Sequence, residues 1–143
     1  MVYQLSIFLE NKPNRLYELT HALEKASVNM HAAMIAETGD FGIVRIIVDD
    51  PDRAHDALKN EGFTVKKTHV IGVEAPDGPG TLSEIAHVLG KNGINIQYIY
   101  AFSLSGRNKA CFIIRTDSYE DAKALIHDDL GLSTFSHKDL GTL

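Results

Sequence analysis

Two turn segments of this chain carry residues suited to binding a small anion. Residues 11–16 (Asn-Lys-Pro-Asn-Arg-Leu) and 77–82 (Asp-Gly-Pro-Gly-Thr-Leu) each follow a short apolar run and precede a helical pattern. A turn at a helix start presents free backbone N–H groups, and these donors and the helix dipole favour an anion such as a carboxylate. Gly78 and Gly80 let a ligand approach the backbone closely. For a single copy we would favour an ordinary strand-to-helix turn, but because the turn occurs twice we favour a ligand-binding role.

An asparagine follows each of the two helical patterns that these turns begin. Asn29 and Asn95 occupy the same place in the two halves of the chain. Their amides both donate and accept hydrogen bonds, which suits a ligand with an ammonium and a carboxylate group on one carbon. Asparagine after a helix also commonly adopts a left-handed cap, which is a purely structural role. Both interpretations stay open at this point.

The other reactive residue types form no catalytic or metal-binding pattern. The seven histidines include no HExxH pair, and His127, beside two aspartates, is interpreted as part of a solvated helix end, so we expect no metal and no cofactor. Cys111 lies in an apolar run, where a packed thiol is expected rather than a nucleophile. Because no nucleophile with an adjacent base can be recognised, we expect no catalytic residues and no enzyme activity.

Two features of the apolar segments allow more than one interpretation. Arg45 interrupts an apolar run, and its stem either extends to solvent, which we favour, or its guanidinium pairs with a carboxylate at an interface. Tyr98, Tyr100 and Phe102 alternate on one strand face. They either wall an apolar ligand pocket or pack against a neighbouring sheet or subunit.

The second half of the chain repeats the first, and this repeat decides the architecture. Matched residues lie 66 positions apart in the pairs Leu16/Leu82, Leu23/Leu89 and Asn29/Asn95. The same offset takes Val44 onto Ala110, whereas two more residues are needed to take Ala54 onto Ala122. We therefore expect two copies of one unit with only a small insertion between these points.

Each half has the same order of elements, namely strand, helix, strand, strand, helix and strand. In the first half, strands are expected at 5–9, 28–36, 41–48 and 63–70, and helices at 16–26 and 51–61. In the second half, strands are expected around 71–73, at 94–102, at 109–115 and at 132–135, and helices at 81–92 and 118–130. Residues 81–84 (Thr-Leu-Ser-Glu) have the form of a capping box. Residues 63–74 are expected to be the last strand of one unit and the first of the next.

The composition is that of an ordinary globular protein, with 44% hydrophobic and 23% charged residues. A net charge of -5 argues against nucleic acid or an anionic membrane as partner. No apolar run approaches the roughly 18 residues that span a bilayer, and the first residues do not resemble a signal peptide. A single cysteine excludes an intrachain disulfide. We therefore expect a cytoplasmic protein.

The second turn, together with Gly-Ile-Asn-Ile at residues 93–96, resembles the signature of the ACT domain family. The first turn, with Val-Asn-Met at residues 28–30, is similar but has Asn14 where the family favours glycine. The resemblance covers nearly the whole chain. It implies an α+β fold of two βαββαβ ferredoxin-like units side by side, at residues 1–69 and 70–143, with antiparallel sheets and helices on one face. It also implies that small effectors, usually amino acids, bind where the two units meet.

The resemblance predicts a sensor of amino-acid metabolism that binds a small molecule, with a homodimer and a partner enzyme as expected assemblies. The alternative is a non-catalytic subunit that binds a partner enzyme without a small ligand. Because of Asn14, we expect the site of residues 11–16 and the Asn95 strand to be weaker or differently selective than the site of residues 77–82 and the Asn29 strand. The candidate ligand-binding residues are Asn11, Lys12, Pro13, Asn14, Arg15, Leu16, Asn29, Met30, Asp77, Gly78, Pro79, Gly80, Thr81, Leu82, Asn95 and Ile96.

Overall fold

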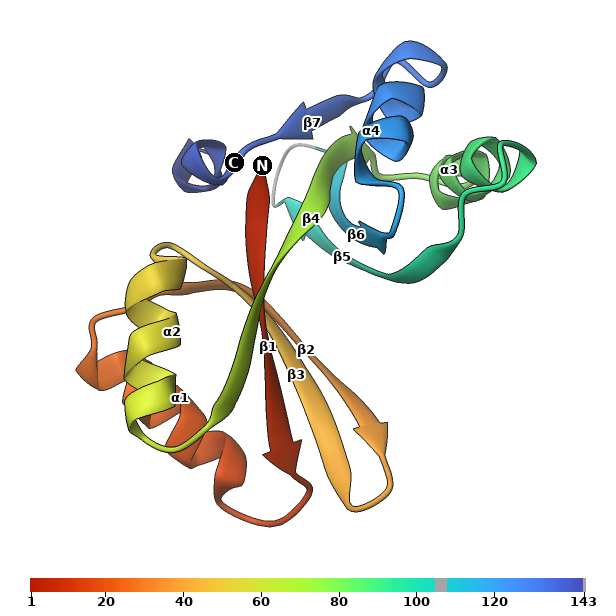
Figure 1. Cartoon of the computed structure of the whole chain (residues 1–143). Coiled ribbons are helices and arrows are strands. Elements are labelled where there is room, and N and C mark those ends of the chain that lie inside the picture. The colour runs from red at the N-terminus through yellow and green to blue at the C-terminus, as the bar shows by residue number, and fades with distance from the viewer. Residues whose placement is uncertain (105–107, 143) are drawn as a thin grey trace. The chain divides into compact units, whose positions relative to one another are not determined.

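The computed structural model describes residues 1–104 and 108–142 and divides into two compact units. The N-terminal unit consists of Tyr3–Thr68, and the C-terminal unit consists of His69–Leu143 together with Met1–Val2. Both units have the element order that the repeat predicts (Figure 1). Among the described residues, no helix is both long enough and apolar enough to cross a membrane. That residues 1–69 and 70–143 are the functional domains stays a prediction.

In the N-terminal unit, two helices cover one face of a four-stranded sheet (Figure 1). Its elements are β1 (Val2–Glu10), α1 (Arg15–Lys25), β2 (Met30–Thr38), β3 (Phe41–Val48), α2 (Pro51–Asn60) and the first part of β4 (Thr64–Pro76). The strand order is β2-β3-β1-β4, and β3 is antiparallel to both of its neighbours. This order puts β2 at an edge of the sheet.

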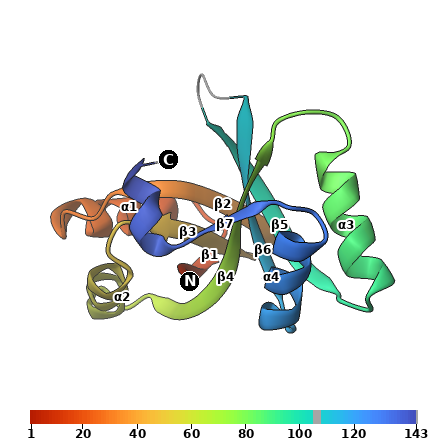
Figure 2. The same cartoon turned by 90° about the horizontal axis from the view of Figure 1, so that it is seen from above.

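The C-terminal unit repeats this arrangement with its own two helices on one face of its sheet (Figure 2). Its elements are the second part of β4, then α3 (Thr81–Lys91), β5 (Ile96–Leu104), β6 (Lys109–Thr116), α4 (Tyr119–Asp128) and β7 (Ser133–Phe135). The strand order is β5-β6-β4-β7, and these neighbours are antiparallel. A 3-10 helix, η1 (His137–Thr142), follows and is not predicted by the sequence pattern. The prediction of two βαββαβ units is confirmed.

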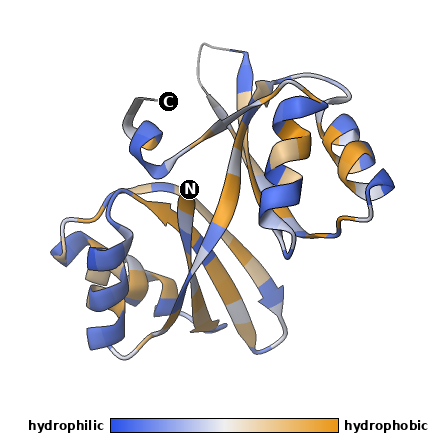
Figure 3. Ribbon diagram, turned by 45° about the horizontal axis from the view of Figure 1, so that its top comes forward, coloured by the Kyte–Doolittle hydropathy of each residue, from blue (hydrophilic) through white to orange (hydrophobic). Residues whose placement is uncertain are grey.

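Each unit has its own apolar core between its helices and its sheet (Figure 3). Successive strand residues point to opposite faces, so the alternating apolar residues of β1 all reach the helices. The three-to-four spacing in α1 and α3 directs one stripe of each helix to the same core. The N-terminal core includes Leu5, Ile7, Leu9, Leu19, Leu23, Val44, Ile46 and Leu58. The C-terminal core includes Ile71, Val73, Ile85, Leu89, Phe112, Ile114, Ala122 and Ile126.

The strand β4 belongs to both units, as the apolar run at residues 63–74 predicts. This strand is 13 residues long and lies next to β1 of the N-terminal unit and next to β6 and β7 of the C-terminal unit. In its second part, Ile71 pairs with Ile114. The two units are therefore joined by a continuous strand and not by a loop linker.

The strand registers correct the predicted position of the insertion. Ile35 pairs with Val44, and Ala101 pairs with Phe112. Ala101 lies 66 positions after Ile35, whereas Phe112 lies 68 positions after Val44. The two-residue insertion therefore lies between Ala101 and Phe112. The expected match of Val44 with Ala110 is wrong, because Val44 matches Phe112. A two-residue shift leaves every side chain on the same face of a strand, so the apolar pattern could not distinguish the two alignments.

The N-termini of α2 and α3 differ in their capping. Asp50 caps α2, because its side chain accepts a hydrogen bond from the Arg53 backbone N–H at 3.0 Å. The capping box expected at residues 81–84 is wrong. Gly80 is the N-cap of α3, and the Thr81 hydroxyl donates to the Pro76 carbonyl at 2.8 Å. The Thr81 side chain thus closes the turn and does not cap the helix.

Gly72 in β4 is expected to tolerate no side chain. A methyl group there would lie 2.5 Å from two ring carbons of Phe135, which is itself buried in β7. Gly72→Ala should therefore lower the free energy of unfolding by about 1–3 kcal/mol through overpacking. Gly42→Ala is the control, because its methyl would lie 3.4 Å from the Ile35 Cγ2 atom, an ordinary contact. Urea denaturation should separate the two variants, and equal stabilities would contradict the packing of Phe135 on Gly72.

Candidate functional site

The two strand-to-helix turns have the same backbone conformation. Asn14 precedes α1 with φ 76° and ψ -13°, and Gly80 precedes α3 with φ 91° and ψ -14°. Both residues are left-handed N-caps without a side-chain capping bond. Asparagine tolerates this region better than most residues, so Asn14 reproduces the shape that glycine adopts in the second turn.

Each turn is held against the hairpin of its own unit. In the N-terminal unit, the Asn11 backbone N–H donates to the Asp40 carbonyl at 2.8 Å, and the Asn11 amide donates to the Gly39 carbonyl at 3.1 Å. In the C-terminal unit, the Asp77 N–H donates to the Asn108 carbonyl at 2.9 Å. These bonds fix the turn beside the ends of the strands, so a ligand at the turn would meet strand residues as well.

The start of α1 offers backbone donors. The Glu18 N–H donates to the Asn14 carbonyl at 3.0 Å, which is the first intrahelical bond of α1. Helix geometry therefore leaves the N–H groups of Leu16 and Tyr17 without an intrahelical acceptor. In α3 the corresponding first bond runs from Glu84 to Gly80 at 2.9 Å. Both helix starts favour an anion at these free donors.

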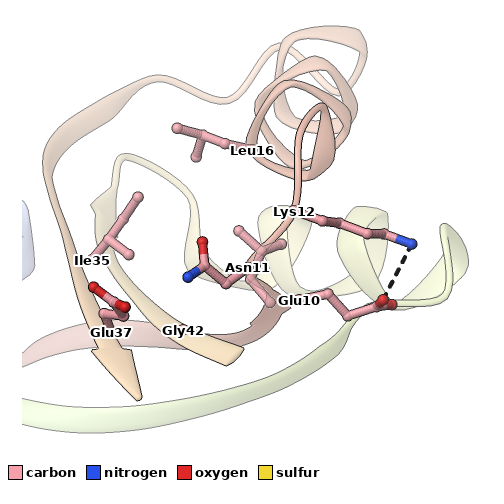
Figure 4. A pocket seen from close by; sticks show the side chains of 8 residues that line it. Glu10, Asn11, Lys12, Leu16, Ile35, Glu37 and Gly42 are labelled. Carbon is pink, nitrogen blue, oxygen red and sulfur yellow. Dashed lines mark ion pairs between the residues drawn. The ribbon is translucent and has the colours of Figure 1, made fainter. Parts of the chain in front are cut away.

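A pocket of about 390 Å³ lies beside the first turn (Figure 4). It is formed by the end of β1, the turn, the start of α1 and the neighbouring parts of β2 and β3. We call it the turn pocket. It is lined by Leu9, Glu10, Asn11, Lys12, Leu16, Ile35, Glu37 and Gly42. All of these residues belong to the N-terminal unit.

The charges of the turn pocket are unevenly distributed. Lys12 Nζ lies 3.2 Å from Glu10 Oε2, and this exposed pair lies on one side of Asn11 (Figure 4). Glu37 and Ile35 lie on the other side of Asn11 (Figure 4). Among the described residues, Glu37 forms no ion pair. The pocket thus has one carboxylate left to bind a cationic group.

A second cavity, of about 240 Å³, adjoins the turn pocket between α1 and β2. We call it the apolar cavity. It shares Leu16 and Ile35 with the turn pocket. Its other lining residues are Leu19, Thr20, Met30, Ala33, Met34, Val44 and Ile46. No charged residue lines it, so its chemistry complements that of the polar turn pocket.

The comparison with family models decides the classification of the chain. A model of the ACT domain pair matches residues 1–143. The chain belongs to the ACT domain pair family. This ACT domain pair is also similar to the solved structure of protein BT0572 from Bacteroides thetaiotaomicron, with 39% identity and a TM-score of 0.90, covering 99% of this chain and 96% of the other. No curated protein matches the chain.

More distant solved structures share the fold of this ACT domain pair. The regulatory subunit of aspartate kinase from Thermus thermophilus is 16% identical, with a TM-score of 0.64 and coverage of 87% of this chain and 89% of the other. The regulatory subunit of aspartate kinase from Thermus flavus is 15% identical, with a TM-score of 0.65 and coverage of 90% and 92%. At this identity, the likeness establishes the fold alone.

The structure brings only some of the predicted residues of the first unit together. Asn11, Lys12 and Leu16 line the turn pocket, and Met30 lines the apolar cavity. Pro13 and Asn14 are exposed in the turn itself. The Arg15 guanidinium pairs with Glu18 and lies 4.9 Å from the centre of the Phe63 ring, so these two residues of its own unit already hold it.

The predicted residues of the second unit lie at the second turn and at the start of β5. Residues 77–80 are exposed, and Leu82 is 45% exposed at the start of α3. Asn95 is exposed, and the adjacent Ile96 begins β5. Asn29 of the N-terminal unit is also exposed; its carbonyl accepts from the Asp49 N–H, and its N–H donates to the Asp49 carboxylate, each at 3.0 Å. A ligand-binding role for these residues stays a prediction.

Sequence reasoning missed five lining residues of the turn pocket, namely Leu9, Glu10, Ile35, Glu37 and Gly42. They lie on three different strands and are brought together by pairing. Leu9 and Glu37 both pair with Gly42, which places the ends of β1 and β2 on either side of a residue without a side chain. Acidic residues at a strand end next to a turn are the signal that could have pointed to this pocket.

The histidine, acidic and cysteine residues of the described part of the chain show no metal cluster and no reactive thiol. The described residues contain no cluster of three or more histidine, cysteine or acidic residues that could hold a metal ion. Cys111 is buried, and burial, with a smaller contribution from the charge of Glu74, raises the pKa of its thiol to about 11. The thiol is therefore protonated at neutral pH and unsuited to nucleophilic chemistry.

Gly80→Ala should reveal the backbone strain of the second turn. A methyl group at Gly80 meets no described atom within 4 Å, so the cost comes from φ and not from a clash. We expect a loss of about 1 kcal/mol in the free energy of unfolding. Gly78→Ala is the control, because Gly78 also has free space but no positive φ. Denaturation curves that shift equally for both variants would contradict the left-handed assignment.

Proposed function

We propose that this ACT domain pair is a non-catalytic regulatory protein of amino-acid metabolism that binds a free amino acid. The observation that supports this most is the turn pocket, where Leu16, in the first turn of α1, and Glu37 line one cavity of about 390 Å³. Cavities of this size, with apolar walls and a few polar groups, are typical of small-molecule sites.

The two polar ends of an amino acid match these two features. The α-carboxylate would accept hydrogen bonds from the N–H groups of Leu16 and Tyr17, where the helix dipole favours negative charge. The α-ammonium would donate to Glu37, and such charge-assisted bonds are the strong ones. Glu10 contributes less, because Lys12 already neutralises it at 3.2 Å. That the second strand of the other unit completes the site stays a prediction from the sequence.

The regulatory part of the proposal rests on analogy of fold. Two proteins of the same fold are described as regulatory subunits of aspartate kinase. Fold alone does not fix function, so a partner enzyme of this chain is a proposal with an associational basis. We infer that amino-acid binding here changes the affinity for a separate catalytic protein.

A second function, binding of a protein partner without a small ligand, is favoured by one exposed aromatic pair. Phe8 and Phe41 are 50% and 42% exposed, and their ring centres lie 5.0 Å apart. Exposed aromatic side chains that cluster are typical of interaction surfaces. Either a second copy of the chain, giving a homodimer, or a partner enzyme would cover this pair. The two functions are compatible with each other.

A thermal-shift screen against the free amino acids separates the two functions. A ligand at about 100 times its dissociation constant adds roughly 2.7 kcal/mol to the stability. For a chain of this size, each kcal/mol raises the melting temperature by about 2 to 5 °C. We expect at least one amino acid to give such a shift. If none does at millimolar concentration, the small-ligand function is refuted and the partner-binding function is favoured.

A further inference from the structure

We propose that the site selects amino acids with an uncharged, apolar side chain of about the size of leucine or methionine. This inference rests on the proposed function and assigns the apolar cavity to the side chain of the ligand. The turn pocket holds the polar groups, and the apolar cavity begins at Leu16 and Ile35, which line both spaces. A ligand whose α-carbon lies in the turn pocket therefore extends its side chain past these two residues.

The lining of the apolar cavity offers no polar group to a ligand side chain. Eight of its nine residues have apolar side chains. The ninth is Thr20, whose hydroxyl lies 3.0 Å from the Leu16 carbonyl and 3.1 Å from the Tyr17 carbonyl of its own helix. Because this hydroxyl donates within α1, a polar ligand side chain would lose its bonds to water without replacement.

Amino acids with charged side chains are disfavoured in both the apolar cavity and the turn pocket. A lysine side chain would place its ammonium among residues that carry no carboxylate. An aspartate carboxylate would either enter this uncharged cavity or stay in the turn pocket, where the charge of Glu37 repels it. Small amino acids leave the cavity unfilled. Each fully buried methylene strengthens binding about fourfold and a partly buried one less, so the three further carbons of leucine should make it bind about 10- to 50-fold more tightly than alanine.

The mouth of the apolar cavity also favours an apolar occupant. Leu16 is 46% exposed and Ile35 is 53% exposed, although both are large aliphatic residues that line the cavity. An apolar ligand side chain would remove surface of both residues from water. The bound ligand would therefore contribute the packing that these two side chains otherwise lack.

The second unit differs at the positions that matter most. The strand registers match Ile35 with Ala101 and Glu37 with Ser103. The ammonium-binding carboxylate and one apolar wall are thus both absent from the equivalent place. We expect one tight leucine site per chain, at the first turn, which reverses the expectation from Asn14 that this turn forms the weaker site.

Calorimetric titration of the full chain with L-leucine, L-methionine, L-alanine, L-aspartate and L-lysine tests the inference. We expect leucine and methionine to bind at one site per chain, alanine about 10- to 50-fold more weakly, and the charged amino acids not at all. If aspartate or lysine binds as tightly as leucine, the proposed selectivity for apolar side chains is wrong, although the proposed amino-acid binding stands. If no amino acid binds, both the selectivity and the proposed function are wrong.

A matched pair of variants locates the side-chain site. Ala33 and Ala101 are both exposed alanines on edge strands, but only Ala33 lines the apolar cavity. Ala33→Phe should fill that cavity and weaken leucine binding by at least tenfold while leaving alanine binding unchanged. Ala101→Phe should leave both unchanged. Leucine binding that survives Ala33→Phe, or that is lost equally in both variants, would overturn the assignment of the cavity.

Discussion

Leu23→Ala and Leu89→Ala are each expected to lower the free energy of unfolding by about 2–5 kcal/mol. The two residues occupy equivalent positions in α1 and α3, with 2% and 0% of their surface exposed. Each lies in the core of its own unit, so each variant removes apolar contacts and leaves a cavity in one unit only. These are the largest effects on stability that we predict.

Both variants should shift a single, shared unfolding transition. The reason is β4, a continuous strand that contributes to the sheets of both units. Loss of one unit would expose the unpaired edge of this strand, so we expect the units to unfold together. Urea denaturation followed by circular dichroism, together with calorimetry, measures this. His87→Ala, at an exposed position of α3, is the control. Two separate transitions, each moved by only one variant, would contradict cooperative folding.

Glu37→Gln is expected to weaken amino-acid binding by about 10- to 100-fold without disturbing the fold. A hydrogen bond to a charged group is worth about 1.5–3 kcal/mol, and the amide of glutamine retains the shape of the carboxylate but not its charge. Glu37 is exposed and forms no ion pair with the described residues, so its loss should change the stability of the free protein by less than about 0.5 kcal/mol.

Two control variants make this prediction specific to Glu37. Glu10→Gln should weaken binding less, because Lys12 already pairs with that carboxylate. Ser103→Ala changes the equivalent residue of the second unit and should leave binding at the turn pocket unchanged. Calorimetric titration with the tightest-binding amino acid gives all three affinities. If Glu37→Gln bound the amino acid with wild-type affinity, the Glu37 carboxylate would not be part of the binding site.

The sequence predicts most of the fold because its signals are local and occur twice. The alternation of Leu5, Ile7 and Leu9 and the helical stripe that includes Leu19 and Leu23 depend only on the period of each element. The boundaries are less accurate. β2 begins at Met30, two residues after the predicted start, because the Val28 N–H donates to the Leu23 carbonyl and still belongs to the end of α1.

Only the turn segment of the site could be predicted from the sequence, for a physical reason. The turn at residues 11–16 is one continuous segment with a recognisable composition. Glu37 reaches the pocket through two successive pairings, from β2 to β3 and from β3 to β1. A register fixed by long-range pairing leaves no local mark in the sequence. The expected capping box at Thr81 is wrong for a different reason. Its local pattern is present, but the pattern does not show that the Thr81 hydroxyl donates to the Pro76 carbonyl.

Amino-acid binding at the turn pocket can be observed by titrating the isotope-labelled full chain with L-leucine and following each backbone amide by two-dimensional NMR. We predict that the largest shift changes occur at residues 10–17 and 35–37, around the turn pocket, and saturate at one leucine per chain. The amides of residues 77–83 serve as the internal reference, because the second turn has the same backbone shape but Ser103 stands in the place of Glu37. A spectrum that stays unchanged with every amino acid, or changes confined to residues 77–83, would contradict amino-acid binding at the turn pocket.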